Sequence, residues 1–334
     1  MVEEVTLRKH NLTETIDMAG INDQADELRA KLFNLRETRP ASHIYLLLNN
    51  ACPVALEHPL HPIELDKRPV KRERAQLSPQ AATATAVDEW QPFVLQFYRA
   101  GENGYVDEEL LDLALNTALA QCTSINGAYV AAWIASELEP KSLALRLASN
   151  CELFDSHHGR RHRIPLYEPH RMALLLDEPE AQLFLNQFLK QLHLWAFIGA
   201  AGELRAITSV DQASTQDAPM ARHLSLALCR AQARTSLARL AMLGLVKSGA
   251  PMPSHAERRI DALLVSADKL GLSHEEDVIF FVLNGLTLSA LWHEHPQARN
   301  CIERSRVDGA PLAGLMAQLT DEMLDEIGHH GADH

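Results

Sequence analysis

The amino-acid sequence predicts an α+β or α/β protein of two lobes: a mixed-sheet α/β lobe over residues 1–209 and an all-helical lobe over residues 210–334. Two observations support this division. Short apolar runs typical of strands alternate with helical patterns as far as Ile207, whereas the patterns after Ser209 are helical only. Residues 210–219 are polar and lie between the two kinds of pattern, as linkers between domains commonly do.

The first lobe is predicted to contain strands that are buried on both faces. The run His43-Ile44-Tyr45-Leu46-Leu47-Leu48 is almost entirely apolar, which is typical of a central strand covered by helices on each side. Further strands are predicted at residues 93–98, 127–136, 152–155, 163–167, 192–198 and 203–207. Because strands and helices alternate along the chain, we expect a mixed sheet.

Helical patterns separate these strands. One helix or two are predicted within residues 11–36, where Leu28, Leu32 and Leu35 share one stripe. Asp107 is expected to cap the next helix, and Pro140 to begin another. Residues 58–92 contain five prolines and a basic cluster, so we expect an irregular, solvated insertion there.

The segment from Arg163 to Leu176 predicts a strand that passes directly into a helix. The strand is expected to end at Glu168, because a residue before proline is biased away from the helical conformation. Pro169 has the fixed φ that suits the first turn of a helix. A second helix is predicted at residues 180–189, before the strand that carries Trp195.

The second lobe is predicted to be a helical bundle, with helices at residues 221–246, 254–270, 273–292, 297–304 and 312–327. The pattern Ser273-x-x-Glu276 matches a capping box, in which two side chains satisfy the first backbone N–H groups of a helix. Residues 278–283 are apolar around the whole helix circumference. The helix that contains them is therefore expected at the centre of the bundle.

Composition and charge argue against several classes of function. The net charge of −13 makes nonspecific binding to nucleic acid or to an anionic membrane unfavourable. The most apolar stretch, residues 278–292, is interrupted by polar residues and is shorter than the roughly 18–20 residues of a membrane span. The N-terminus lacks the pattern of a secretory signal, and five scattered cysteines without a C-x-x-C motif favour reduced thiols. We therefore expect a cytoplasmic protein with no nucleic-acid partner and no membrane insertion.

The sequence carries no recognisable catalytic or metal-binding pattern. It contains neither G-x-S-x-G, nor a P-loop, nor the glycine fingerprint of a dinucleotide site. His293 and His295 are two residues apart, whereas a helical zinc pair needs histidines four apart on one face. We therefore expect a binding protein rather than an enzyme, with no cofactor and no metal.

Charge segregation in the second lobe identifies candidate partner-binding residues. Residues 218–256 contain no Asp or Glu but include Arg222, Arg230, Arg234, Arg239 and Lys247. Two interpretations are open: a solvated helix face opposed by acids of a neighbouring helix, or a surface that attracts an acidic segment of a partner. Tryptophans such as Trp195 are more often core residues than interface anchors.

Several motifs, in this order along the chain, resemble the effector adaptors of type VI secretion systems, the Tap/Tec chaperones that load toxins onto a VgrG spike. The family's aromatic-Asp-Pro-Arg motif is similar to Tyr167-Glu168-Pro169-His170, and its Gly-Leu-Ser/Thr-x-Glu-x-Asp helix start to residues 271–277. The buried strand at residues 43–48 and the small-residue strand end at residues 133–136 also match. Glu168 and His170 stand where the family has Asp and Arg, so an acid–arginine clamp would have to be rebuilt here, with Arg171 next in sequence.

This resemblance implies a non-enzymatic adaptor that binds one cognate effector and delivers it to the VgrG spike. The effector would contact a cleft between the lobes, near Tyr167, Glu168, His170, Arg171 and Trp195, together with the basic helix of Arg222, Arg230, Arg234 and Arg239. A hinge at residues 210–219 would let the lobes close on it. The alternative is a regulatory or scaffolding protein whose α/β lobe binds a small ligand.

Overall fold

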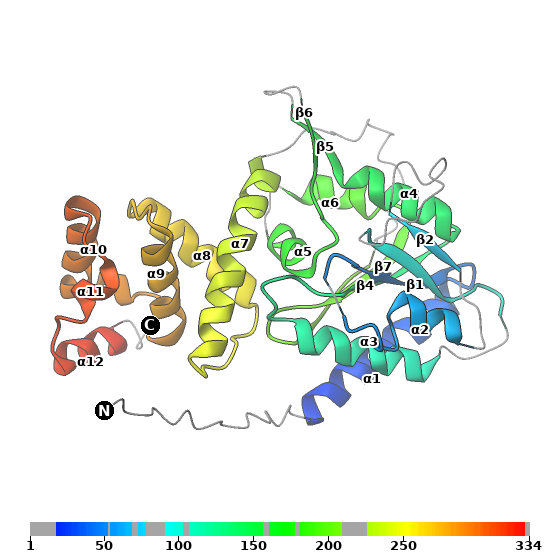
Figure 1. Cartoon of the computed structure of the whole chain (residues 1–334), viewed down its shortest axis with the longest axis horizontal. Coiled ribbons are helices and arrows are strands. Elements are labelled where there is room, and N and C mark those ends of the chain that lie inside the picture. The colour runs from blue at the N-terminus through cyan, green and yellow to red at the C-terminus, as the bar shows by residue number, and fades with distance from the viewer. Residues whose placement is uncertain are drawn as a thin grey trace, which may run out of the picture.

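The computed structural model describes the chain in eight stretches, residues 18–52, 54–68, 73–77, 91–102, 107–155, 160–177, 181–208 and 226–330. They form two lobes, as predicted: an N-terminal lobe built around a β-sheet and a helical C-terminal lobe (Figure 1). The fold class is therefore α+β. The predicted hinge at residues 210–219 lies outside the described residues.

The central sheet has six strands in the order β2-β3-β1-β4-β7-β8. The strands are β1 (His43–Leu48), β2 (Arg74–Gln76), β3 (Phe93–Tyr98), β4 (Val130–Ser136), β7 (Leu192–Ile198) and β8 (Leu204–Thr208). Every pairing in the described sheet is antiparallel, so the expected mixed sheet is wrong. The helical connection from β3 to β4 crosses over β1, which lies between them, so these two strands run in the same direction without being neighbours.

Helices cover both faces of the sheet, which explains why β1, β3 and β4 are buried at every position. One face packs against α1 (Met18–Thr38) and α3 (Glu108–Gln121). The other packs against α4 (Pro140–Asn150), α5 (Pro169–Leu176) and α6 (Gln182–Phe188) (Figure 1). Because side chains alternate along a strand, Leu46 points into the first layer and Leu47 into the second.

Local signals placed most element boundaries correctly. Asp107 caps α3 by accepting a hydrogen bond from the Leu110 N–H at 3.1 Å, and prolines begin α4 and α5. The described part of the proline-rich insertion is more regular than predicted, because it contains α2 (Pro62–Lys67) and the edge strand β2. The predicted strand at residues 163–167 is wrong: a separate hairpin pairs β5 (Glu152–Asp155) with β6 (Arg160–Arg163). Pro165 lacks the N–H needed to continue β6.

The helical lobe contains α7 (Leu226–Lys247), α8 (Ala256–Lys269), α9 (Glu275–Thr287), α10 (Pro296–Asp308), α11 (Leu312–Met316) and α12 (Asp321–His329). As predicted, α9 is central, lying between α7 and α8 on one side and α10 and α11 on the other (Figure 1). It packs so closely on α8 that a Cβ added at Gly285 would collide with Leu263. The segment predicted as one helix at residues 312–327 is two, because Thr320 caps α12 by accepting from the Met323 N–H.

The expected capping box of α9 is not formed. The cap is His274, one residue later than predicted, and no side chain makes a capping bond. Asp277 instead occupies the third helical position and is buried. Its carboxylate accepts hydrogen bonds from the Ser305 hydroxyl at 3.0 Å and the Leu312 N–H at 2.8 Å. Asp277 therefore fixes α10 and α11 against α9.

No helix among the described residues has the length and apolar character needed to cross a bilayer.

Candidate functional site at the junction of the two lobes

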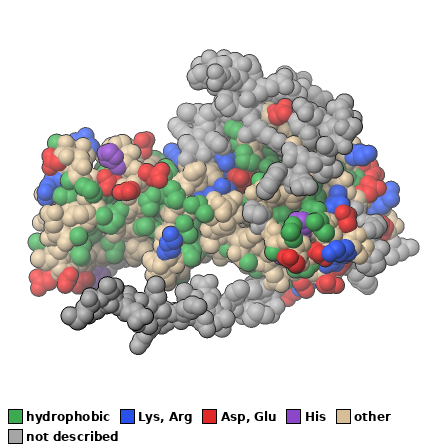
Figure 2. All heavy atoms as spheres, in the orientation of Figure 1, with side chains coloured by type: hydrophobic (Ala, Val, Ile, Leu, Met, Phe, Trp, Pro, Cys, Tyr) green, Lys and Arg blue, Asp and Glu red, His purple; other side chains and the backbone are tan. Residues whose placement is uncertain are grey.

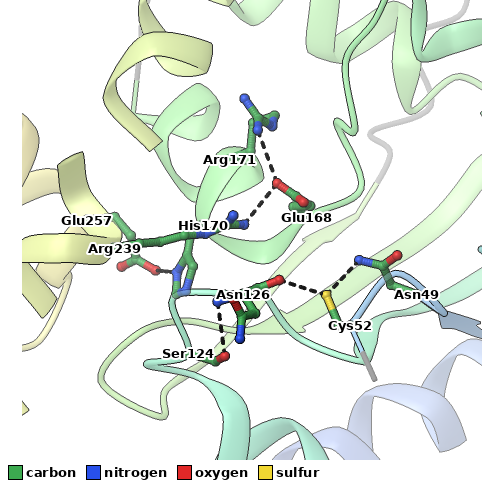
Figure 3. Close-up of polar contacts among 9 residues, drawn as sticks. All are labelled: Asn49, Cys52, Ser124, Asn126, Glu168, His170, Arg171, Arg239 and Glu257. Atoms are coloured by element: carbon green, nitrogen blue, oxygen red, sulfur yellow. Dashed lines mark hydrogen bonds and ion pairs between the residues drawn. The ribbon is translucent and has the colours of Figure 1, made fainter. Parts of the chain in front are cut away.

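The first turn of α5 lies at the contact between the two lobes, against α7 and α8. Glu168 is the residue before the helix, with an extended backbone at φ −66° and ψ 130°, and Pro169 takes the first helical position. The side chain of Glu168 does not cap its own helix. It extends instead toward two arginines, one from each lobe (Figure 3).

Glu168 bridges the lobes by accepting two charged hydrogen bonds on one oxygen. Its Oε2 accepts from Nη2 of Arg171 at 3.1 Å and from Nη2 of Arg239, on α7, at 2.9 Å. All three side chains are largely buried, with 12% of Glu168, 6% of Arg171 and 12% of Arg239 exposed. Burial lowers the pKa of Arg171, and the neighbouring Glu168 opposes this shift. Glu168 thus pairs with one arginine of its own helix and one of the helical lobe.

A second connection joins His170 of α5 to Glu257 of α8. The Glu257 side chain is fully buried, and its Oε1 lies 3.1 Å from Nδ1 of His170 and 2.9 Å from the backbone N of Ala200. Burial acts to raise the pKa of Glu257, but the bonds from His170 and Ala200 outweigh it, so the pKa is lowered. An ionised carboxylate can only accept, so Nδ1 of His170 carries the proton. Ala200 itself packs into the core of the helical lobe.

Two loops of the N-terminal lobe complete the junction. The Cys52 thiol donates to the carbonyl oxygen of Asn126 at 3.0 Å and accepts from Nδ2 of Asn49 at 3.1 Å (Figure 3). Gly127 has φ +90°, and a Cβ there would lie 3.0 Å from Cys52 Sγ and 3.4 Å from Arg239 Nη2. Only glycine fits this position without strain.

Cys52 is poorly suited to nucleophilic chemistry. Burial, with a further contribution from Glu168, raises the pKa of its thiol to about 11. A thiol with such a pKa carries little thiolate at neutral pH. Among the described residues, no group of three or more His, Cys, Asp or Glu is arranged to hold a metal ion. The contacts Glu168–Arg239 and His170–Glu257 attach one lobe to the other.

The structure brings together four of the nine predicted site residues: Glu168, His170, Arg171 and Arg239. Tyr167 is only 6% exposed, so it does not face an open cleft. Trp195 is fully buried in the N-terminal core, with its ring centroid 5.4 Å from that of Phe188. Both residues could reach a partner only if the surrounding structure opened.

The remaining predicted residues belong to the basic helix. Arg234 pairs with Asp261 of α8 at 2.7 Å, so its charge is opposed by an acid of a neighbouring helix. Arg222 and the side chain of Arg230 lie outside the described residues. Arg234 therefore fits the interpretation of a helix face opposed by acids of a neighbouring helix, whereas Arg239 is largely buried and pairs with Glu168, the residue before α5.

Sequence reasoning missed Glu257, Cys52, Asn49 and Asn126. Glu257 carried one usable signal, because it is the first acid after the acid-free residues 218–256. The other three carry no local pattern that distinguishes them from ordinary loop residues. No family model matches the chain, and neither does any curated protein or solved structure.

Proposed function

We propose that this protein is an adaptor that binds a cognate type VI secretion effector and loads it onto the VgrG spike. The observation that carries this proposal is the use of the motif at residues 167–171. The motif supplies the resemblance to the adaptor family, and its Glu168 and His170 connect to Arg239 and Glu257 of the other lobe. A motif whose side chains hold the two lobes together favours a binding scaffold over a catalytic site.

The ionic junction bears on how an adaptor of this kind would bind. Residues of α5, α7 and α8 are joined by buried charges, so the two lobes form one preformed surface. A preformed surface loses less conformational freedom on binding, which leaves more of the interaction energy for affinity. We therefore favour attachment of the effector to the outside of the joined lobes over insertion between them.

Co-purification of the tagged full-length protein from its native host, followed by mass spectrometry, tests the proposal. The expected result is recovery of one large toxin-like protein together with a VgrG spike protein. Glu168→Gln should reduce this recovery because it weakens the junction, whereas Glu303→Gln, which affects an exposed pair with Arg306, should not. Recovery of neither partner, in cells that express the secretion system, would favour a regulatory or scaffolding protein with a ligand-binding α/β lobe.

The electrostatic contribution of the basic helix needs a separate test. Charge reversal at Arg234 alone would also break its ion pair with Asp261. The informative variant is therefore the swap Arg234→Glu with Asp261→Arg, which retains an ion pair but inverts the charge on α7. Unchanged recovery of the effector by this variant would show that Arg234 does not attract the partner.

A further inference from the structure

Outside its buried face, α9 carries apolar residues that are partly buried, together with Asn284 and the exposed Thr287. The buried face is packed in the core through Val278, Phe281, Val282 and Gly285. A helix packed on one side ordinarily carries polar residues on the other. Here the half-buried residues form what we call the α9 face: Ile279, Phe280, Leu283 and Leu286 of α9, with Leu237 and Leu240 of α7.

Figure 2 shows hydrophobic side chains gathered over α9 and the adjoining part of the helical lobe. The helix α7 borders this surface, because a Cβ added at Gly244 would lie 3.0 Å from Cδ1 of Leu283. Leu283 itself is partly buried. Apolar residues that gather at a surface can mark a binding site, so the α9 face is a candidate docking surface.

The charge around the α9 face restricts the kind of occupant. Residues 271–330 contain ten Asp and Glu residues but only three Arg, a net charge of −7 with histidines neutral. Glu275 and Glu276 are exposed in the first turn of α9, at one end of the face. Lys247, in the last turn of α7, is also exposed. Exposed acids at one end of a group of apolar residues complement a partner that is apolar and basic.

We propose that the α9 face is the docking site for an amphipathic helix of another protein, with an apolar stripe flanked by Lys or Arg. This inference rests on the proposed function, in which the partner is the effector. A helix is the better fit than an added strand, because the face is made of helices, whose backbone groups are already paired. At about 1.5 Å per residue, α9 offers roughly 20 Å of contact, which matches a partner helix of similar length.

A second copy of this chain is a poorer occupant than a basic helix. Two copies meeting through the α9 face would bring together two regions that each carry a net charge of −7 over residues 271–330. Like charges placed across an interface disfavour association. An acidic partner is disfavoured for the same reason.

The test uses a defined probe, a fluorescent 18-residue amphipathic peptide of Leu and Lys, and follows its anisotropy with the full-length protein. A Leu–Glu peptide of the same pattern is the control peptide. We expect the Leu–Lys peptide to bind the native protein and to bind Phe280→Lys at least about tenfold more weakly, since this change removes an apolar contact and adds repulsion. Val307→Lys is the matched control, because Val307 is 67% exposed on α10 and lies outside the α9 face.

Glu275→Lys with Glu276→Lys is the second variant, and both positions are exposed, so the fold should be retained. It should weaken binding severalfold and reduce its dependence on salt. The proposal is overturned if the Leu–Lys peptide does not bind the native protein. Equal binding to Phe280→Lys and to the native protein would also overturn it.

The same variants separate this inference from the proposed function. If the native protein recovers the toxin and Phe280→Lys recovers it equally well, the adaptor proposal stands and the α9 face is not its binding site. If the native protein binds the Leu–Lys peptide through the α9 face but recovers no toxin or spike, the docking site stands and its partner is another basic helix.

Discussion

The substitution Glu168→Gln tests the ionic junction most directly. It keeps the shape of the side chain but removes the negative charge that faces Arg171 and Arg239. Two largely buried guanidinium groups would then lack their common counter-charge. Removing one partner of a buried pair costs about 3–5 kcal/mol, and the 12% exposure of Glu168 places the expected loss near about 3 kcal/mol.

Urea denaturation followed by circular dichroism and tryptophan fluorescence measures this loss. A fall of about 3 kcal/mol corresponds to a midpoint lower by about 1 M at the upper end of ordinary urea slopes. Because the junction joins the lobes, unfolding of the variant should also divide into two transitions, one for each lobe. Trp292 reports the helical lobe, while Trp133 and Trp195 report the N-terminal one.

Three variants sharpen this interpretation. Glu303→Gln removes a surface carboxylate from an exposed pair and should leave the midpoint unchanged. Glu168→Asp keeps the charge but shortens the side chain, so its loss should be smaller than that of Glu168→Gln. Combining Glu168→Gln with Arg239→Met should cost less than the two single losses together, because one stranded cation is removed. A loss below about 1 kcal/mol for Glu168→Gln would refute the ionic junction.

The remaining predictions concern a buried acid, two glycines and two thiols. The folded-state pKa of Glu257 is lowered, so the native protein should be more stable than Glu257→Gln above the ordinary pKa of 4.5, and this advantage should shrink as the pH falls below that value. Equilibrium unfolding across pH measures the difference in stability, and a difference that stays constant with pH would contradict the prediction. Thermal unfolding should show that Gly285→Ala destabilises the protein by about 1–2 kcal/mol, because the added methyl overpacks against α8. Gly314→Ala should stabilise it by about 0.5–1 kcal/mol, because the space around Gly314 is open and alanine favours a helix. A change in stability of the same sign for both variants would contradict this reasoning. Burial raises the pKa values of Cys52 and Cys122 to about 11, so iodoacetamide at pH 8 should modify both thiols only after unfolding, and mass spectrometry of native protein labelled at either would contradict this.

The sequence predicted the strands better than it predicted the sheet. An apolar run such as residues 43–48 indicates a strand covered on both faces, and β1 is buried at all six positions. The direction of the neighbouring strands depends on the order of the strands in the sheet, and packing over the whole lobe decides that order. Local patterns therefore could not show that β1 lies between β3 and β4.

Only part of the candidate site could be predicted from the sequence. Glu168 followed by Pro169 predicts an abrupt helix start, and α5 does begin at Pro169. The partners of α5 come from α7 and α8, about 70 to 90 residues further along the chain. A single sequence contains no periodicity that links Glu168 to Arg239 or His170 to Glu257. Burial of these groups could be recognised only once the lobes were placed against each other.

The positions of the arginines change which partner the charge distribution favours. An acid-free helix in an acidic protein first suggests attraction of an acidic segment. Two of its arginines are, however, matched within the chain: Arg239 by Glu168 and Arg234 by Asp261. Residues 271–330 keep a net charge of −7, so the electrostatic field around this part of the helical lobe attracts cations. The apolar α9 face lies in this same region, and the electrostatic and packing arguments therefore favour the same basic, amphipathic partner.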